Sequence, residues 1–316
     1  MAVYTEVPAE RLAAFLARYD GGTLVSAKGI AEGVSNSNFL VETSTARYIL
    51  TLYERRITES DLPFFIDLME HLADAGLPVP RPIRDRTGKA LQQLEGRAAC
   101  LIQYLPGVSV SHPTPPQCRS AAAALARLHL AGQRFGQSRT NHLSRGWWAE
   151  TAASLHGRLN ELSPGLQSLV DNSLAHVGAH WPGHLPAGIV HADLFPDNVL
   201  MLGDKVSGLI DFYFACTDLY AYDLAVLIAA WAFPADGSAP DPALLDALLA
   251  GYQSVRPLSP AELAALPTLG MGAALRFLLS RAQDWFQPSA DALVLRKDPM
   301  PFARRLAWHS AQLGHG

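Results

Sequence analysis

Three polar side chains follow apolar, strand-like segments in the second half of the chain, at a spacing that suits catalysis. Asp193 and Asn198 lie in a loop after the apolar segment that ends at His191, and Asp211 follows a second apolar segment. A carboxylate such as that of Asp193 accepts a proton from a hydroxyl group. The amide oxygen of Asn198 and the carboxylate of Asp211 are hard oxygen ligands of the kind that hold Mg²⁺ on a polyphosphate. One base and two magnesium ligands are the groups that phosphoryl transfer requires.

Each of these residues also has a structural interpretation when it is taken alone, because isolated Asp and Asn residues near turns usually stabilise the turn. A pair of carboxylates such as Asp193 and Asp211 also occurs in glycosidases. That alternative leaves Asn198 and the strand-rich start of the chain unexplained. We interpret His191 as a hydrogen-bonding residue beneath the loop. Asp197 is open as a ligand or as a solvated side chain, and we favour the second.

Hydrophobic spacing and turn residues predict the elements that hold this loop. The segments 188–192, 199–202 and 205–210 are predicted strands, and Gly203-Asp204 predicts a hairpin turn between the last two. The rest of the second half has mainly helical spacing. The helices expected there are 117–131, 147–159, 166–180, 219–231, 242–254, 260–266, 271–286 and 301–313.

The first hundred residues have mainly strand-like patterns, and the Ser/Pro-rich residues 108–116 separate them from the helical part. Short connections between the strands predict antiparallel pairing. The sequence therefore predicts an α+β fold with a small antiparallel β-rich N-lobe (residues 1–104) and a larger, mainly helical C-lobe (residues 105–316). The elements expected in the N-lobe are helices 8–19 and 62–75 and strands 23–27, 38–43, 47–52, 91–94 and 97–104.

Composition limits the class of protein. The 316 residues are 49% hydrophobic and 17% charged, so the chain can bury a large core. A net charge of −4 argues against broad nucleic-acid binding. Three isolated cysteines, an odd number, argue against a disulfide framework and indicate a reducing compartment. The longest strongly apolar run, residues 224–233, is too short to span a bilayer. We expect a soluble cytoplasmic protein with a small-molecule substrate and no nucleic-acid or membrane partner.

The pattern His-x-Asp-x-x-x-x-Asn at residues 191–198, followed by Ile-Asp-Phe at 210–212, resembles the catalytic and metal loops of the aminoglycoside phosphotransferase/choline kinase superfamily. These enzymes are relatives of protein kinases, and the resemblance covers nearly the whole chain. It implies a protein-kinase-like two-lobed fold. It also implies that Asp193 is the catalytic base, that Asn198 and Asp211 bind Mg²⁺, and that ATP is the phosphoryl donor.

Further segments are similar to bacterial homoserine kinases of this superfamily. That resemblance implies transfer of the γ-phosphoryl group of ATP to the hydroxyl of L-homoserine, in threonine biosynthesis. The similar segments are residues 48–54, 62–65, 76–82, 211–216 and 275–281, together with Asp284-Trp285.

The superfamily resemblance also implies nucleotide contacts in the N-lobe. Small polar side chains and backbone N–H groups in the loop 29–38 can form a nest for phosphate oxygens. The third strand of such kinases normally carries a phosphate-binding Lys, and Thr51 stands at that position here. The expected contacts are the hinge residues Gln103, Tyr104 and Leu105, at the adenine, and the loop residues Ser35, Asn36 and Ser37, at the phosphates.

Arg276 lies inside an apolar helix, where a buried guanidinium needs a partner. A protein carboxylate and a substrate carboxylate are both open as that partner. We expect Arg276, Arg281 and Trp231 at the substrate site. Asp223 we interpret as a structural residue beneath the catalytic loop, and His129 as a core histidine.

Two alternatives to a homoserine kinase remain open. One is a kinase for another small alcohol, such as choline, an aminoglycoside or methylthioribose. An aminoglycoside pocket needs an excess of acidic residues, whereas Arg276 and Arg281 favour an acceptor with a carboxylate. The other alternative is a catalytically dead nucleotide-binding module, which the missing Lys leaves open.

Overall fold

The computed structural model describes residues 5–30, 36–54, 58–287 and 296–314. The chain divides into two compact units, an N-terminal unit (residues 1–106) and a C-terminal unit (residues 107–316).

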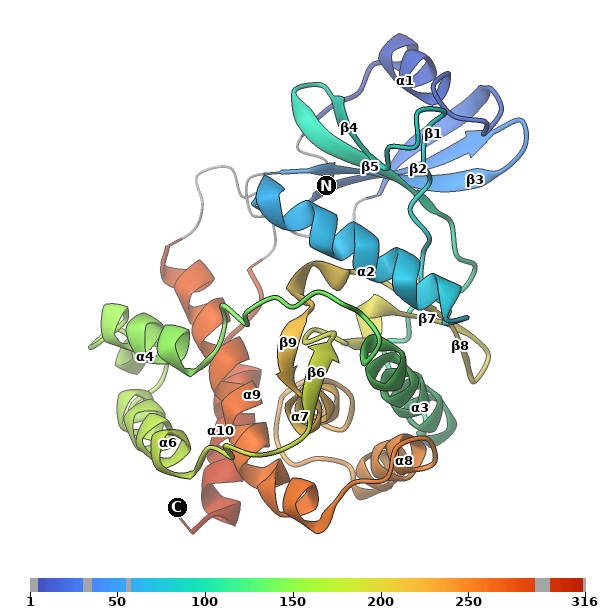
Figure 1. Cartoon of the computed structure of the whole chain (residues 1–316). Coiled ribbons are helices and arrows are strands. Elements are labelled where there is room, and N and C mark those ends of the chain that lie inside the picture. The colour runs from blue at the N-terminus through green and yellow to red at the C-terminus, as the bar shows by residue number, and fades with distance from the viewer. Residues whose placement is uncertain (1–4, 31–35, 55–57, 288–295, 315–316) are drawn as a thin grey trace. The chain divides into compact units, whose positions relative to one another are not determined.

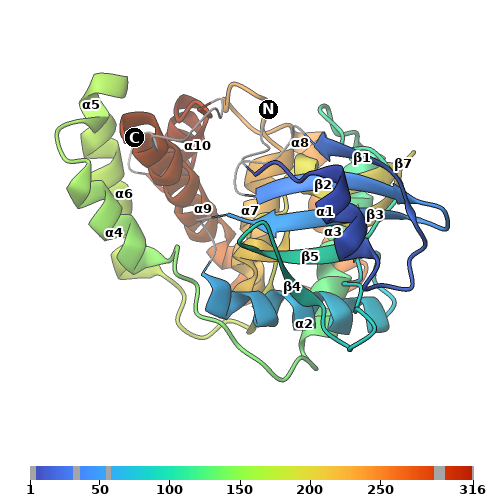
Figure 2. The ribbon, with the colours of Figure 1, turned by 90° about the horizontal axis from the view of Figure 1, so that it is seen from above.

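The N-terminal unit contains a five-stranded antiparallel sheet with the strand order β1-β2-β3-β5-β4 (Figure 1). Helix α1 lies over the strands in both views (Figures 1 and 2), and it buries Leu12, Phe15 and Leu16 in one cluster with Val41 and Leu50 of the sheet. The predicted antiparallel β-rich region is therefore confirmed. Its elements are α1 (Ala9–Leu16), β1 (Leu24–Ile30), β2 (Asn36–Thr43), β3 (Arg47–Tyr53), the short 3₁₀ helix η1 (Glu59–Asp61), α2 (Leu62–Asp74), β4 (Leu91–Leu94) and β5 (Arg97–Gln103).

The C-terminal unit is mainly helical and contains two short two-stranded sheets. The predicted hairpin is confirmed as β7 and β8, with Gly203 at a positive φ of 61° in the turn. The helices of the C-terminal unit are α3 (Pro115–Gly132), α4 (Arg145–Ser154), α5 (Leu159–Leu162), α6 (Leu166–His180), α7 (Tyr220–Trp231), α8 (Pro242–Gln253), α9 (Pro260–Phe286) and α10 (Met300–Gln312). The strands and 3₁₀ helices of this unit are β6 (Ala187–Val190), η2 (Pro196–Asn198), β7 (Val199–Leu202), β8 (Lys205–Leu209), η3 (Phe212–Phe214) and β9 (Cys216–Leu219).

Strand β9 was not predicted from the sequence. Residues 211–219 lack the alternation of apolar and polar side chains that marks a half-buried strand. The segment becomes a strand because it pairs antiparallel with β6, with Cys216 opposite Val190. This pairing brings the end of the predicted metal loop beside the strand that leads to the predicted catalytic loop.

Helix α9 was predicted as two helices, 260–266 and 271–286, and this was wrong. The structure has one helix of 27 residues with Pro267 inside it. Proline normally interrupts a helix because it lacks an N–H group. Here the following turns are buried against α7, α6 and α10, and that packing maintains the helix. The helix is long and apolar enough to cross a membrane, but 67% of its most apolar window is buried in the structure, as in the core helix of a globular unit.

The opposite error concerns residues 147–159, which were predicted as one helix and form two in the structure. Helix α4 ends at Ser154 and α5 begins at Leu159, with Gly157 between them at a φ of 82°. A left-handed residue cannot continue an α-helix, so the chain turns there. The apolar spacing continues through the turn because Leu155 and Leu159 both enter the same core.

Candidate active site

The loop that carries Asp193 begins where β6 ends, and its backbone is fixed by Asp223 of α7. The Asp223 carboxylate accepts hydrogen bonds from the backbone N–H groups of His191 and Ala192, both at 2.8 Å. Ala192 has a φ of 63°, a left-handed conformation that is uncommon for a residue with a Cβ. Its carbonyl accepts a hydrogen bond from Arg276 of α9. Both polar backbone groups of the strained residue are therefore held by distant side chains, and the structural role predicted for Asp223 is confirmed.

His191 and His129 are buried parts of the same hydrogen-bonded network. His191 Nε2 lies 3.0 Å from the Ile210 carbonyl, and His191 Nδ1 accepts from the Asp193 N–H at 3.3 Å, so the ring is neutral with its proton on Nε2. His129 lies between Asp223 (3.0 Å) and the Tyr252 hydroxyl (2.7 Å). Burial lowers the pKa of both histidines, which keeps His191 neutral. The predictions of a supporting His191 and a core His129 are confirmed.

Asn198 and Asp211 are brought together by the hairpin. The Asn198 side chain donates to the Asp193 carbonyl at 2.7 Å and to the Asp193 carboxylate at 3.2 Å. Its amide oxygen therefore points away from these groups and is available as a ligand. The Ile210 N–H donates to the Asn198 carbonyl at 3.0 Å, and Asp211 follows at once in a left-handed conformation. Asn198 is thus hydrogen-bonded to Asp193, and Asp211 directly follows Ile210, whose N–H is bonded to the Asn198 carbonyl.

The electrostatics of this site favour a bound cation. Burial raises the pKa of Asp193 to about 7; Arg276 opposes the rise, and Asp211 and Asp197 add to it. The Asp211 side chain reaches solvent, but the protein around its carboxylate raises the pKa to about 6, and Asp197 contributes again. Carboxylates whose ionised forms repel one another are stabilised by a divalent ion. Lys297, 3.5 Å from Asp197, is an exposed partner that compensates only part of this charge.

The donor set fits Mg²⁺ bound together with a polyphosphate. Asn198 and Asp211 supply two hard oxygen ligands. Within the described ranges, no group of three or more His, Cys, Asp or Glu side chains forms a complete protein cage for a metal. Mg²⁺ commonly retains waters and phosphate oxygens as its other ligands, and an incomplete protein cage leaves room for them.

The structure places the predicted substrate residues in different surroundings. Arg276 is 2% exposed and, besides the Ala192 carbonyl, has the Asp193 carboxylate 3.9 Å away. Trp231 is 1% exposed and donates from Nε1 to the Leu194 carbonyl at 2.8 Å. Both therefore support the loop that carries Asp193. Arg281 lies over the Phe302 ring at 4.5 Å and donates to a backbone carbonyl. Direct contact of these three side chains with a substrate stays a prediction.

In the N-terminal unit, the described residues that were predicted at the phosphates have protein partners. Ser35 lies outside the described residues. The Asn36 side chain accepts from the Glu54 N–H at 3.4 Å, and the Ser37 hydroxyl donates to the Glu54 carboxylate at 2.8 Å. The hydroxyl of Thr51, at the usual Lys position, is buried and donates to the Asn38 side chain at 2.8 Å.

The predicted hinge residues lie at the end of strand β5: Gln103 is its last residue, and Tyr104 and Leu105 follow it. The Gln103 N–H donates to the Arg81 carbonyl at 2.8 Å, so it is not free for a nucleotide. The Tyr104 ring lies under the Arg47 guanidinium at 5.9 Å. Among the residues that the structure describes, no backbone hydrogen bond is made by the N–H groups of Tyr104 and Leu105. The backbone of these two residues is therefore available to a ligand.

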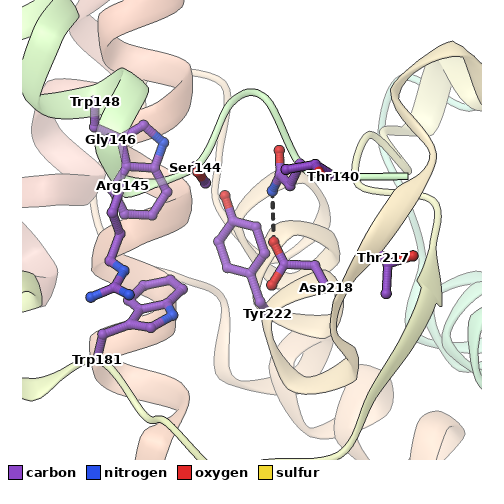
Figure 3. Close-up of a pocket in the computed structure, with 10 residues that line it drawn as sticks. Thr140, Ser144, Arg145, Gly146, Trp148, Trp181, Thr217, Asp218 and Tyr222 are labelled. Atoms are coloured by element: carbon purple, nitrogen blue, oxygen red, sulfur yellow. Dashed lines mark hydrogen bonds between the residues drawn. The ribbon is translucent and has the colours of Figure 1, made fainter. Parts of the chain in front are cut away.

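The C-terminal unit also contains a pocket of about 450 Å³ that sequence reasoning missed (Figure 3). Its wall includes Asp218, whose carboxylate accepts a hydrogen bond from Asn141 at 2.6 Å, and the Arg145 guanidinium, which lies over the Trp181 ring at 5.7 Å. No motif marks these residues, because they come from α4, β9 and two loops. The remaining lining residues are Thr140, Ser144, Gly146, Trp148, Thr217 and Tyr222.

Comparisons with known proteins agree with this geometry. Residues 26–258 match the model of the phosphotransferase enzyme family. The chain is 54% identical to the homoserine kinase of Methylorubrum populi, covering 98% of this chain and 96% of that protein. It is 52% identical to the homoserine kinase of Xanthobacter autotrophicus, covering 98% and 97%.

Solved structures show the same fold at lower identity. A spectinomycin phosphotransferase in complex with ADP and spectinomycin superposes with a TM-score of 0.68 at 16% identity, covering 96% of this chain and 95% of that one. A microcompartment-associated aminopropanol kinase gives a TM-score of 0.64 at 20% identity, covering 96% of each chain. These likenesses confirm the predicted α+β kinase-like fold.

Proposed function

The chain belongs to the phosphotransferase enzyme family and, within it, to the homoserine kinases, and we propose that it transfers the γ-phosphoryl group of ATP to the side-chain hydroxyl of L-homoserine. The product is O-phospho-L-homoserine, and the pathway served is threonine biosynthesis. The full-length identity to homoserine kinases supports the acceptor. The observation that carries the reaction type is the assembly of Asp193, Asn198 and Asp211 around the Ile210 hydrogen bond.

In this proposal Asp193 is the base. A pKa of about 7 in the free protein suits a group that accepts a proton from a hydroxyl near neutral pH. Arg276, 3.9 Å from the carboxylate, favours its ionised form. The hydrogen bond from the Asn198 amide fixes the direction of the carboxylate. The chain thus positions the base, which is the main contribution that a protein makes to phosphoryl transfer.

Asn198 and Asp211 would hold Mg²⁺. The ion would neutralise charge on the phosphate oxygens and so assist their transfer. In the N-terminal unit, the backbone of Gln103, Tyr104 and Leu105 is proposed to read adenine, and Ser35, Asn36 and Ser37 to lie at the phosphates. The unpaired N–H groups of Tyr104 and Leu105 support the hinge assignment. Three free, buried cysteines support a reducing cytoplasm as the place of action.

A coupled assay of ATP turnover tests the proposal. The wild-type protein is assayed with Mg²⁺, ATP and one acceptor at a time: L-homoserine, choline, methylthioribose or kanamycin. We expect turnover with homoserine and little with the other three. The variant Asp193→Asn should lose about 10²–10⁴-fold in kcat, because general-base assistance is lost while the shape of the side chain is kept.

Three outcomes would contradict the proposal. Faster turnover with another acceptor would reassign the substrate. Near-normal kcat in Asp193→Asn would remove Asp193 from the role of base. ATP binding without turnover of any acceptor would indicate a catalytically dead nucleotide-binding module.

A further inference from the structure

The pocket described above has side walls of opposite charge. Figure 3 shows Arg145 and Trp181 on one side, Asp218 on the other, and Tyr222 between them. The volume of about 450 Å³ lies within the range of sites for small ligands. Charged groups on two facing walls suit a ligand that itself carries two opposite charges.

The Asp218 carboxylate, on the negative wall, has no cationic partner among the described residues. The Asp218 carboxylate is partly buried, and its hydrogen-bond donors, the Asn141 amide and the Leu219 N–H, are both neutral. Burial raises the pKa of Asp218, while these hydrogen bonds and the more distant Arg276 oppose the rise. No Lys or Arg of the described ranges lies within ion-pair distance of this carboxylate. An ammonium group at this point would meet a carboxylate already oriented by two donors.

The Arg145 guanidinium, on the positive wall, also has no partner of opposite charge among the described residues. The Arg145 guanidinium lies over the Trp181 ring at 5.7 Å, which fixes one face of it and leaves its N–H groups at the pocket. Within the part of the chain that the structure describes, no carboxylate is within ion-pair distance of Arg145. A planar guanidinium binds a carboxylate through two parallel hydrogen bonds. The wall therefore has the chemistry of a carboxylate receptor.

Tyr222, at the floor of the pocket, is the residue that connects the pocket to Arg276 and Asp193. Tyr222 is fully buried, and its hydroxyl makes no hydrogen bond of normal geometry among the described residues. It lies close enough to Arg276 for the guanidinium to lower its pKa against the effect of burial. Arg276 in turn lies 3.9 Å from the Asp193 carboxylate. The order Asp218, Tyr222, Arg276, Asp193 links the pocket to the catalytic loop.

From this arrangement we propose that the pocket binds the amino-acid end of the acceptor: Asp218 receives the α-ammonium group, Arg145 receives the α-carboxylate, and the side-chain hydroxyl extends toward Asp193. The inference rests on the proposed function, because it takes L-homoserine as the acceptor. It gives Arg145, not Arg276, the role of carboxylate ligand. Arg276 remains a positioning residue for the loop.

Acceptor analogues that lack one charge provide the test. The compound 3-aminopropan-1-ol has the ammonium and hydroxyl groups of homoserine without the carboxylate, and 4-hydroxybutyrate has the carboxylate and hydroxyl groups without the ammonium. The wild-type protein, Arg145→Gln and Asp218→Asn are each assayed with homoserine and with both analogues. The KM for ATP is measured in parallel.

Each variant should lose discrimination for one charge only. Arg145→Gln should lower kcat/KM about 10- to 100-fold for homoserine and 4-hydroxybutyrate, and leave 3-aminopropan-1-ol nearly unchanged, because a charge-assisted hydrogen bond is lost. Asp218→Asn should lower it for homoserine and 3-aminopropan-1-ol, and leave 4-hydroxybutyrate nearly unchanged. The KM for ATP should stay constant in both variants.

Arg158→Gln is the matched control, because Arg158 also lies over an aromatic ring, Phe286 at 4.1 Å, and is exposed outside the pocket. It should not alter the response to any acceptor. The Arg145 side chain makes no hydrogen bond within the described ranges, so Arg145→Gln should fold even if Asp218→Asn does not. If wild-type protein phosphorylates homoserine and Arg145→Gln matches Arg158→Gln with all three acceptors, the pocket assignment is overturned. If wild-type protein leaves homoserine unphosphorylated, the proposed function itself fails.

Discussion

The two units bury different kinds of polar side chain. Among the described residues of the N-terminal unit, the buried polar residues are neutral apart from Asp85. In the C-terminal unit they include three histidines, three arginines and two carboxylates. A buried neutral pair is satisfied by a hydrogen bond, whereas a buried charge needs a partner of opposite sign or shifts its pKa. The residues concerned are Asn36, Ser37, Thr43 and Thr51 in the first unit, and His129, His191, Asp223, Arg256, Glu262, Arg276, Arg305 and His309 in the second.

This difference shows how the loop that carries Asp193 is supported. The side chains that hold it come from far along the chain: Asp223 is 32 residues from His191, Trp231 is 37 from Leu194, and Arg276 is 84 from Ala192. In the N-terminal unit, Thr51 meets Asn38 only 13 residues away, on the adjacent strand. The strained loop is thus fixed by contacts that exist only when the whole C-terminal unit is folded.

The largest expected effect comes from removing the charge at the centre of this support. Asp223→Ala leaves the N–H groups of His191 and Ala192, and the His129 ring, without their acceptor. We expect a loss of about 3–5 kcal/mol in the free energy of unfolding, because the donors remain buried. Chemical denaturation measures it. Asp241→Ala, which removes an exposed N-cap of α8, is the control, with about 1 kcal/mol expected. Equal losses would show that Asp223 is no special support.

Acid should destabilise the C-terminal unit through His309. Burial lowers the pKa of His309 to about 4, and no hydrogen-bond partner for its ring lies within the described ranges. Between pH 6.5 and 4 the unfolded chain takes up a proton that the folded protein does not, so stability falls as the pH falls, by roughly 3 kcal/mol in total. Denaturation of wild-type protein and His309→Gln across this range measures it. The variant should show the smaller slope, and parallel slopes would contradict the assignment.

A smaller effect is expected where one neutral hydrogen bond supports the loop. Trp231→Phe keeps a large aromatic ring but leaves the Leu194 carbonyl without its donor. We expect a loss of about 1–3 kcal/mol in stability, the typical cost of an unsatisfied buried group. Trp285→Phe on α9 is the matched control, because Trp285 is 38% exposed. If both variants lose the same stability in thermal unfolding, the hydrogen bond contributes nothing.

The smallest effect is expected in the N-terminal unit. Thr51→Val removes the hydroxyl that donates to Asn38 and keeps the branched shape. We expect a loss of about 1 kcal/mol in stability and less than about a tenfold change in kcat/KM for ATP, since a neutral hydrogen bond is lost and no ion pair. Steady-state kinetics with varied ATP measures the second quantity. A loss of three orders of magnitude would mean that Thr51 replaces the missing Lys in function.

Local sequence patterns were enough to predict the sheet of the N-terminal unit and to single out Asp193, Asn198 and Asp211. The apolar runs at residues 39–41 in β2 and 48–50 in β3, and the spacing from His191 to Asn198, are properties of short segments, which the sequence displays directly. The patterns failed where pairing or packing at a distance decides the outcome. Strand β9 exists through its pairing with β6, and α9 continues through Pro267 because its later turns are buried. The pocket with Arg145 and Asp218 has no signal in the sequence, because it joins separate elements.

Two residues of α9, Gly272 and Arg276, are one helical turn apart and so lie on the same face. A Cβ on Gly272 would lie 2.5 Å from the Trp181 ring, so the glycine allows this wall of the pocket to rest against the helix. Arg276 holds the Ala192 carbonyl, next to Asp193. One turn of helix therefore fixes the spacing between the Trp181 wall of the pocket and the loop that carries Asp193. A rotation or shift of α9 would move the Trp181 contact and the Ala192 contact together. Redesign of the proposed acceptor specificity should therefore change residues on the Arg145 side of the pocket and leave this turn of α9 intact.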